Sequence, residues 1–159
     1  MKKYQVSLNY EGFADNEAVI LEMARAHICV REAKQQILTA FTVHQILVRE
    51  DIAAAEQEHF VVFMLNTQMD IIDRQTVTKG TLNASLIHPR EVFKEAIRLN
   101  SACILIAHNH PSGGLEASAE DIAVTKRIKE AGTLLGIELV DHVIVTQAGY
   151  HSMKESNEL

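Results

Sequence analysis

Two histidines separated by one residue, His108 and His110, form the part of the sequence with the clearest capacity for chemistry. In extended backbone, residues i and i+2 point to the same side, so both imidazoles can approach one point in space. The chain has 8 histidines in 159 residues. Chance alone would give such a pair about 0.4 times in a chain of this composition, so the pair by itself is a weak signal.

A carboxylate follows in the same segment and strengthens the pattern. Asp121 falls in the first turn of the helix expected next, and Pro111 and the glycines after it can bend the loop between them. Two imidazoles and one carboxylate would leave the fourth tetrahedral position of Zn²⁺ open for water. The pattern therefore predicts a catalytic zinc site with His108, His110 and Asp121 as ligands, because a structural zinc site would be closed.

The same residues also have an ordinary structural interpretation. Ser118 and Asp121 fit the Ser-x-x-Asp pattern of a capping box, in which side chains satisfy free amides at the start of a helix. The two interpretations are compatible. The pair Gly113-Gly114 is interpreted as a bend, because no GxxxxGK[ST] phosphate-binding loop follows a strand.

Hydrolysis of an amide by activated water also needs a group that moves a proton onto the leaving nitrogen. Glu58 comes directly before an apolar run at residues 60–65, so it would lie at the end of a buried strand. It could face the metal if that strand is next to the one leading to His108. Glu56 and Glu50 are alternatives, and an acidic residue at a strand edge is more often simply solvated.

Other polar residues give weaker signals. Asp141 and His142 lie in a predicted strand, and they are either a pair that supports the site or a structural feature. Cys103 lies within an apolar run and is interpreted as an inert core thiol. Arg90, at a turn into a predicted helix, is a weak candidate for an anion contact.

The elements that must position these residues alternate between helix and strand patterns. Residues 1 to about 14 are expected to form a short strand or arm, followed by a helix beginning near Asp15. The elements expected after them are a helix from Thr42, strands at 60–65 and 71–78, a helix at 89–100, a strand at 102–107, a helix at 118–135 and a strand at 137–145. This order predicts an α/β sandwich around a mixed sheet.

Composition and charge limit the class of protein. The chain is 47% hydrophobic and 23% charged, which is the balance of one globular domain. A formal net charge of −6 argues against a surface made for wrapping nucleic-acid phosphates. The sequence shows no signal-peptide or membrane-spanning pattern. Because Cys29 and Cys103 are widely spaced and form no CxxC, we expect a reducing compartment and a cytoplasmic location.

The pattern HxHx7SxxD with an upstream glutamate resembles the JAMM, or MPN-type, metalloproteases. Four further segments are similar to the RadC family, and the resemblance covers about residues 42 to 153. These segments are 58–67, Gly80-Thr81-Leu82-Asn83 with His88-Pro89-Arg90-Glu91, Ala107-His108-Asn109-His110-Pro111-Ser112-Gly113, and Glu138-Leu139-Val140-Asp141-His142.

This resemblance implies a cytidine-deaminase-like α-β-α sandwich with a mixed sheet, and one Zn²⁺ per chain as cofactor. It implies that His108, His110 and Asp121 are the metal ligands. It also implies that Ser118 helps to hold a tetrahedral oxyanion and that Glu58 is the general base. The expected activity is that of a zinc metallopeptidase acting on a peptide or isopeptide bond of a protein substrate.

The chain departs from the family pattern in two ways. Ala117 stands where many relatives have proline, and Gly114 lies where many have an acidic residue nearby. Longer relatives carry a helix-hairpin-helix region before the metal domain. We therefore expect an N-terminal arm and helix at residues 1–41 and the RadC-like JAMM domain at residues 42–159.

Two other function classes are alternatives to the hydrolase. The first is a non-catalytic interaction module of a DNA-repair or mobile-element system. The net charge gives DNA binding little physical support in this chain. The second, a nucleobase deaminase, is disfavoured because it needs a PCxxC thiolate pair. No membrane partner is expected.

Overall fold

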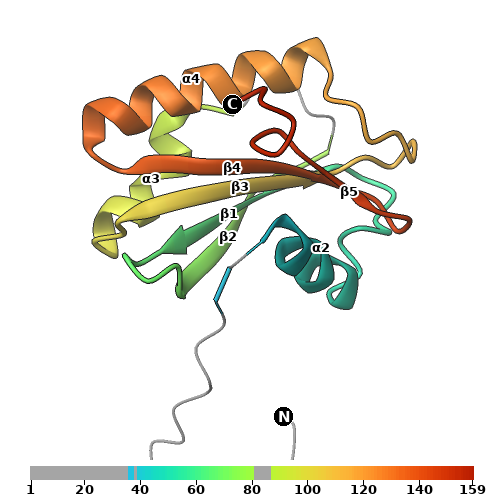
Figure 1. The fold of residues 1–159 in the computed structure, drawn as a ribbon, viewed down its shortest axis with the longest axis horizontal. Helices are drawn as coiled ribbons and strands as arrows, with labels where there is room; N and C mark the ends of the chain where they lie inside the picture. Colours follow the sequence, from blue (N-terminus) through green and yellow to red (C-terminus); the bar gives the residue numbers. More distant parts are fainter. Residues whose placement is uncertain (1–35, 38, 81–86) are drawn as a thin grey trace, which may run out of the picture. The chain divides into compact units, whose positions relative to one another are not determined.

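The computed structural model describes residues 36–37, 39–80 and 87–159 (Figure 1). The arm and helix expected within residues 1–35, together with Cys29, lie outside the described residues. The expected division of the chain at residue 41 therefore stays a prediction.

The described part of the chain forms a five-stranded mixed sheet with helices on both faces. In chain order the elements are α2 (Ala40–Arg49), β1 (His59–Leu65), β2 (Ile71–Lys79), α3 (Pro89–Arg98), β3 (Cys103–Asn109), α4 (Ala119–Leu135), β4 (Glu138–Val145) and β5 (Tyr150–Ser152). The strand order is β2-β1-β3-β4-β5, and only β3 and β4 are parallel. Figure 1 shows α3 and α4 over one face and α2 over the other. The predicted α/β sandwich with a mixed sheet is confirmed.

The central strand β3 is longer than the sequence predicts. It includes His108 and Asn109, because His108 pairs with Phe60 of β1 and with Ile144 of β4. The first histidine of the pair therefore lies inside the sheet rather than after it. The short strand β5 was not predicted, since three residues are too few to show a period.

Two apolar clusters hold the layers together, one on each face of the sheet. Side chains alternate along β3, so Ile104 and Ile106 pack toward α3 and α4. Leu105 and Ala107 pack toward α2 on the opposite face. The same alternation places His108 on the α4 face and directs Asn109 to the α2 face. Both of these polar residues are fully buried.

The helix α4 brings the third candidate ligand to the sheet. It begins after the N-cap residue Ser118 and is followed by Gly136, whose φ of 68° is the left-handed conformation that ends helices. Asp121 lies in its first turn, against the end of β3.

In the described part of the chain, no helix combines the length and apolar character that crossing a bilayer would require.

Candidate metal centre

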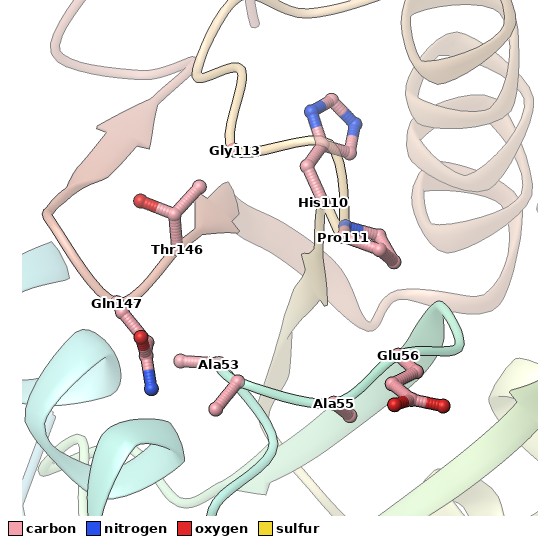
Figure 2. Close-up of a pocket in the computed structure, with 9 residues that line it drawn as sticks. Ala53, Ala55, Glu56, His110, Pro111, Gly113, Thr146 and Gln147 are labelled. Atoms are coloured by element: carbon pink, nitrogen blue, oxygen red, sulfur yellow. The ribbon is translucent and has the colours of Figure 1, made fainter.

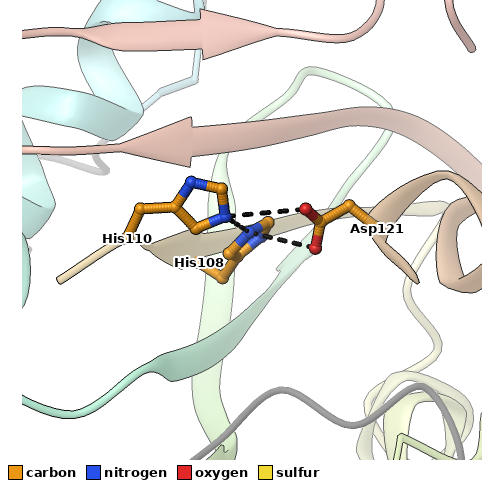
Figure 3. Close-up of side chains that lie close together, drawn as sticks. All are labelled: His108, His110 and Asp121. Carbon is orange, nitrogen blue, oxygen red and sulfur yellow. Dashed lines mark hydrogen bonds and ion pairs between the residues drawn. The ribbon is translucent and has the colours of Figure 1, made fainter. Parts of the chain in front are cut away.

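The three predicted metal ligands converge on one point. His108 Nε2 lies 2.9 Å from His110 Nε2 and 3.2 Å from Asp121 Oδ1. His110 Nε2 lies 3.5 Å from Asp121 Oδ2. Figure 3 shows both imidazoles and the carboxylate directed toward one another. The structure therefore brings together side chains from a strand, the loop after it and a helix.

The spacing of these atoms fits a small tetrahedral cation. Zinc binds imidazole nitrogen and carboxylate oxygen at about 2.0–2.1 Å, so tetrahedral ligand atoms lie roughly 3.3 Å apart. The observed separations, from 2.9 to 3.5 Å, bracket that value. Imidazole and carboxylate groups are also common zinc donors. The cluster of His108, His110 and Asp121 can therefore bind a divalent metal ion.

A backbone carbonyl determines how His110 faces the cluster. Its Nδ1 lies 2.8 Å from the carbonyl oxygen of Gly114. A carbonyl oxygen only accepts, so Nδ1 carries the hydrogen and donates it. Neutral His110 then presents the lone pair of Nε2 to the cluster, as a metal ligand must.

Ser118 orients the carboxylate of Asp121 through the capping box that the sequence predicted, and this interpretation is confirmed. The Ser118 backbone N–H and hydroxyl donate to Asp121 Oδ2 at 2.8 and 2.6 Å. The Asp121 N–H donates to Ser118 Oγ at 3.1 Å. The serine therefore supports a candidate ligand whether or not it also contacts a substrate.

Glu58 lies beside the cluster, directly before β1. Because β1 pairs antiparallel with β3, with Phe60 opposite His108, continuation of that register places Glu58 opposite His110. The charge of Glu58 contributes to a raised pKa of His110. Of the alternatives, Glu50 forms an ion pair with Arg74, and Glu56 is exposed and lines the same cavity as His110.

Asn109 is a residue of the site that the sequence reasoning missed. Its side-chain oxygen accepts from the His59 N–H at 2.7 Å, and its amide donates to the carbonyls of Ala55 and Gln57, both at 3.1 Å. It therefore fixes the loop that carries Glu58. Its place between the two histidines of an extended strand was a usable signal, since it had to point to the opposite, buried face.

The structure separates the roles of Asp141 and His142. His142 is fully buried, and its Nε2 lies 2.8 Å from His108 Nδ1. Asp141 accepts from the Ser152 hydroxyl at 2.6 Å and from the Lys154 N–H at 3.0 Å. His142 therefore contacts a candidate ligand directly, whereas Asp141 fixes β5 and the turn after it.

The remaining candidates have structural roles. His88 caps α3, with its Nδ1 accepting from the Arg90 N–H at 3.2 Å. The Arg90 side chain forms an exposed pair with Glu91. Burial raises the pKa of the Cys103 thiol, as expected of an unreactive core cysteine.

A small cavity lies on one side of His110. Its volume is about 230 Å³, below the range of about 300–1,000 Å³ typical of sites that enclose a whole small molecule. Figure 2 shows three loops around it, which contribute residues 53–56, then His110, Pro111 and Gly113, and last Thr146 with Gln147. A cavity of this size suits one side chain or a short part of a larger substrate.

The electrostatics of the cluster keep two of the three candidate ligands, His108 and Asp121, in the deprotonated form that binds metal near neutral pH. Burial lowers the pKa of His108 to about 4, so this imidazole is neutral at pH 7. A hydrogen bond with Asp121 is the main cause of a raised pKa at His110. Burial acts to raise the pKa of Asp121, but the hydrogen bond from His110, the charge of His108 and the contacts with Ser118 together lower it.

These shifts predict that the metal-free protein loses stability as the pH falls from 6.5 toward 4. The unfolded state, with an ordinary histidine pKa, binds a proton in this window that folded His108 does not bind. His142, whose pKa burial also lowers, acts in the same direction. His108 alone should cost about 2 kcal/mol of unfolding free energy by pH 5.

Two other groups do not reverse this trend. The raised pKa of His110 gives a stabilisation that is fully present below pH 6.5 and is lost only at higher pH. Asp121, with its lowered pKa, keeps its contribution at pH 5. Urea unfolding of chelator-treated protein at pH 6.5 and pH 5, where the His110 contribution is the same, measures the effect. Equal unfolding free energies at the two pH values would contradict it.

Comparison with known proteins identifies the same family as the sequence motifs. A family model described as "RadC-like JAB domain" matches residues 37–158. The chain is 46% identical over 153 residues to a UPF0758 protein of Rubrobacter xylanophilus, covering 94% of this chain and 67% of that protein. It is 53% identical over 109 residues to a UPF0758 protein of Shouchella clausii, covering 69% of this chain and 47% of that protein.

A UPF0758 protein of Clostridium novyi is 50% identical over 113 residues, which cover 71% of this chain and 50% of that protein. The chain thus spans about half the length of the Shouchella and Clostridium relatives and 67% of the Rubrobacter relative. The matched region includes all the residues of the candidate metal centre.

Proposed function

The chain belongs to the RadC-like JAB domain family, and from this premise we propose that it is a zinc-dependent hydrolase that cleaves a peptide or isopeptide bond. One observation carries the proposal. The Nε2 atoms of His108 and His110 and the carboxylate of Asp121 lie within 2.9–3.5 Å of one another. Three protein ligands of these types are the set that catalytic zinc sites use.

His108, His110 and Asp121 would hold the metal. When bound, Zn²⁺ supplies a Lewis acid that polarises a carbonyl and lowers the pKa of water toward 7. The chain contributes the orientation of each ligand. The Gly114 carbonyl fixes His110, Ser118 fixes Asp121, and His142 contacts His108.

Glu58 would move the proton that amide hydrolysis requires. Its carboxylate would take a proton from the attacking water and pass it to the leaving nitrogen of the cleaved bond. Its position beside His110 and the loop held by Asn109 support this assignment. The small cavity next to His110 would receive a side chain of the substrate.

Ser118 would donate its hydroxyl hydrogen to the developing oxyanion. In the structure this hydrogen is donated to Asp121 Oδ2 at 2.6 Å. Because a hydroxyl has only one hydrogen, Ser118 would have to release Asp121 as the oxyanion forms. Asp121 Oδ2 would still accept from the Ser118 backbone N–H at 2.8 Å, so the carboxylate would stay oriented.

Replacement of Ser118 by Ala is expected to lower kcat by about 100- to 1,000-fold, which is typical for loss of one oxyanion donor. It should also cost about 1 kcal/mol of stability, because the helix loses its N-cap. The zinc content should not change, and Ser118→Thr should recover most of the activity. If turnover of Ser118→Ala fell only in proportion to a loss of bound zinc, Ser118 would act only as the N-cap of α4 and not as an oxyanion donor.

The proposed function is tested with the full chain and libraries of linear and isopeptide-linked peptides. Mass spectrometry should show cleavage products with zinc-loaded protein, none after chelation, and recovery when Zn²⁺ is added back. Protein that binds zinc but cleaves no amide would contradict the proposal. Salt-dependent DNA binding by that protein would then support a non-catalytic module.

A further inference from the structure

A buried chain of hydrogen bonds connects two of the candidate ligands behind the metal-binding face. His108 Nδ1 lies 2.8 Å from His142 Nε2, and His142 Nδ1 lies 2.5 Å from Thr125 Oγ1. The Thr125 hydroxyl in turn donates to the backbone carbonyl of Asp121 at 2.6 Å. His108 and His142 are fully buried and Thr125 is 3% exposed, so water cannot replace these contacts.

The direction of every hydrogen bond follows from the carbonyl at the end of this chain. A carbonyl oxygen only accepts, so the single hydroxyl hydrogen of Thr125 points to Asp121. The sulfur of Met153, at 3.3 Å, is a weaker and more distant acceptor for that hydrogen. Thr125 Oγ1 must therefore accept from His142, whose Nδ1 carries the hydrogen.

The same logic extends to His108. A neutral imidazole carries one hydrogen, and in His142 it is used at Nδ1, so His142 Nε2 accepts. His108 Nδ1 then donates to it, and the lone pair of His108 Nε2 faces His110 and Asp121. His108 reaches the tautomer of a metal ligand without a backbone carbonyl of the kind that fixes His110.

We propose that His142, held by Thr125, is a positioning residue that fixes the metal-binding tautomer of His108 and couples it to the backbone of Asp121. This inference rests on the proposed function, because it concerns the same metal centre. Outer partners of this kind fix ring orientation and raise the basicity of the ligand. His142 would touch neither the metal nor the substrate.

The surroundings of His142 keep its ring in place. Its backbone N–H donates to Asp141 Oδ1 at 2.7 Å, and its carbonyl accepts from the Met153 N–H at 3.0 Å. The Phe60 ring contacts it edge-on, with ring centroids 5.9 Å apart. The β4 strand and the turn after β5 therefore give His142 a single position against His108.

The wild-type, metal-free protein provides the first test. Long-range ¹H–¹⁵N NMR correlations distinguish a ring nitrogen that carries hydrogen from one that does not. We expect hydrogen on Nδ1 of both His108 and His142 at neutral pH. The inference would be overturned if His142 carried its hydrogen on Nε2, or if His108 carried hydrogen on Nε2 and none on Nδ1. This measurement needs no variant that might fail to fold.

A matched pair of variants provides the second test. Thr125→Val keeps the shape of the side chain and removes the hydroxyl, whereas Thr125→Ser keeps the hydroxyl. Competition with a chelator should show Zn²⁺ binding 10- to 100-fold weaker in Thr125→Val and close to wild type in Thr125→Ser. A purely structural role would lower the stability of Thr125→Val and leave its zinc affinity and its His108 tautomer unchanged, and that result would overturn the inference.

These readouts separate the inference from the proposed function. A protein that binds zinc with the expected tautomers and responds to Thr125→Val, yet cleaves no amide, would support the inference and contradict the hydrolase. A protein that cleaves amides while Thr125→Val binds zinc normally would overturn the inference alone.

Discussion

Replacement of Asp121 by Asn is expected to weaken Zn²⁺ binding by more than about 100-fold and to abolish metal-dependent hydrolysis. This loss is larger than the loss typical of a residue that only hydrogen-bonds to a metal ligand. The amide oxygen of asparagine is neutral, so two imidazoles would remain as the effective ligands. The variant should still fold, because that oxygen can accept from the Ser118 N–H as the carboxylate does at 2.8 Å. Elemental analysis and chelator competition measure the loss.

Glu120→Gln is the matched control for this variant. Glu120 is the exposed neighbour of Asp121 in the first turn of α4, and its substitution removes the same charge near the same helix terminus. We expect zinc binding and turnover close to wild type. Zinc content of Asp121→Asn equal to that of the control would mean that the carboxylate is not a ligand.

Replacement of Glu58 by Gln is expected to lower kcat by about 100- to 10,000-fold, the range that a positioned general base contributes. Glutamine has nearly the same size as glutamate but cannot take a proton from the attacking water. The three ligands are unchanged in this variant, so its zinc content should equal that of wild type. Steady-state kinetics and metal analysis on the same preparation measure both quantities.

Glu56→Gln provides the comparison for Glu58. Glu56 lies two residues earlier on the same loop, is exposed, and lines the cavity next to His110. A substitution there should change KM more than kcat, because the residue could contact substrate without moving a proton. If Glu58→Gln kept normal turnover and Glu56→Gln were inactive, Glu56 rather than Glu58 would be the general base.

The sequence was sufficient to predict that His108, His110 and Asp121 come together, because they lie close to one another along the chain. His108 and His110 share one extended segment, and Asp121 falls at the start of the next helix. Local periodicity alone therefore placed all three at one end of the sheet. The same periodicity predicted the helices from their apolar faces and β1, β3 and β4 from their buried runs. The strand β2, which has no buried residue, was predicted only from a loose alternation after β1.

The partners behind the ligands required the three-dimensional arrangement. His142 is 34 residues from His108, and their contact depends on the parallel pairing of β3 with β4. A register shift between Ile104 and Leu105 also affects which β4 residues face α4. No local pattern encodes these features, so the sequence left the role of His142 open.

The position of Glu58 was predictable from the sequence only in part. The sequence placed it at the end of a strand, but whether it lies near the candidate ligands depended on which strand is adjacent to β1. The structure shows that β1 pairs with β3, with Phe60 opposite His108. Asn109 was predictable in principle, since a buried amide on a central strand must find partners for its polar atoms.

We propose above that His108, His110 and Asp121 bind one catalytic Zn²⁺. The most direct test is anomalous diffraction at the zinc absorption edge from crystals of the zinc-loaded protein. We expect one peak about 2.0–2.1 Å from His108 Nε2, His110 Nε2 and an Asp121 oxygen. A zinc peak elsewhere with no density between these atoms, or three side chains that point apart, would contradict it.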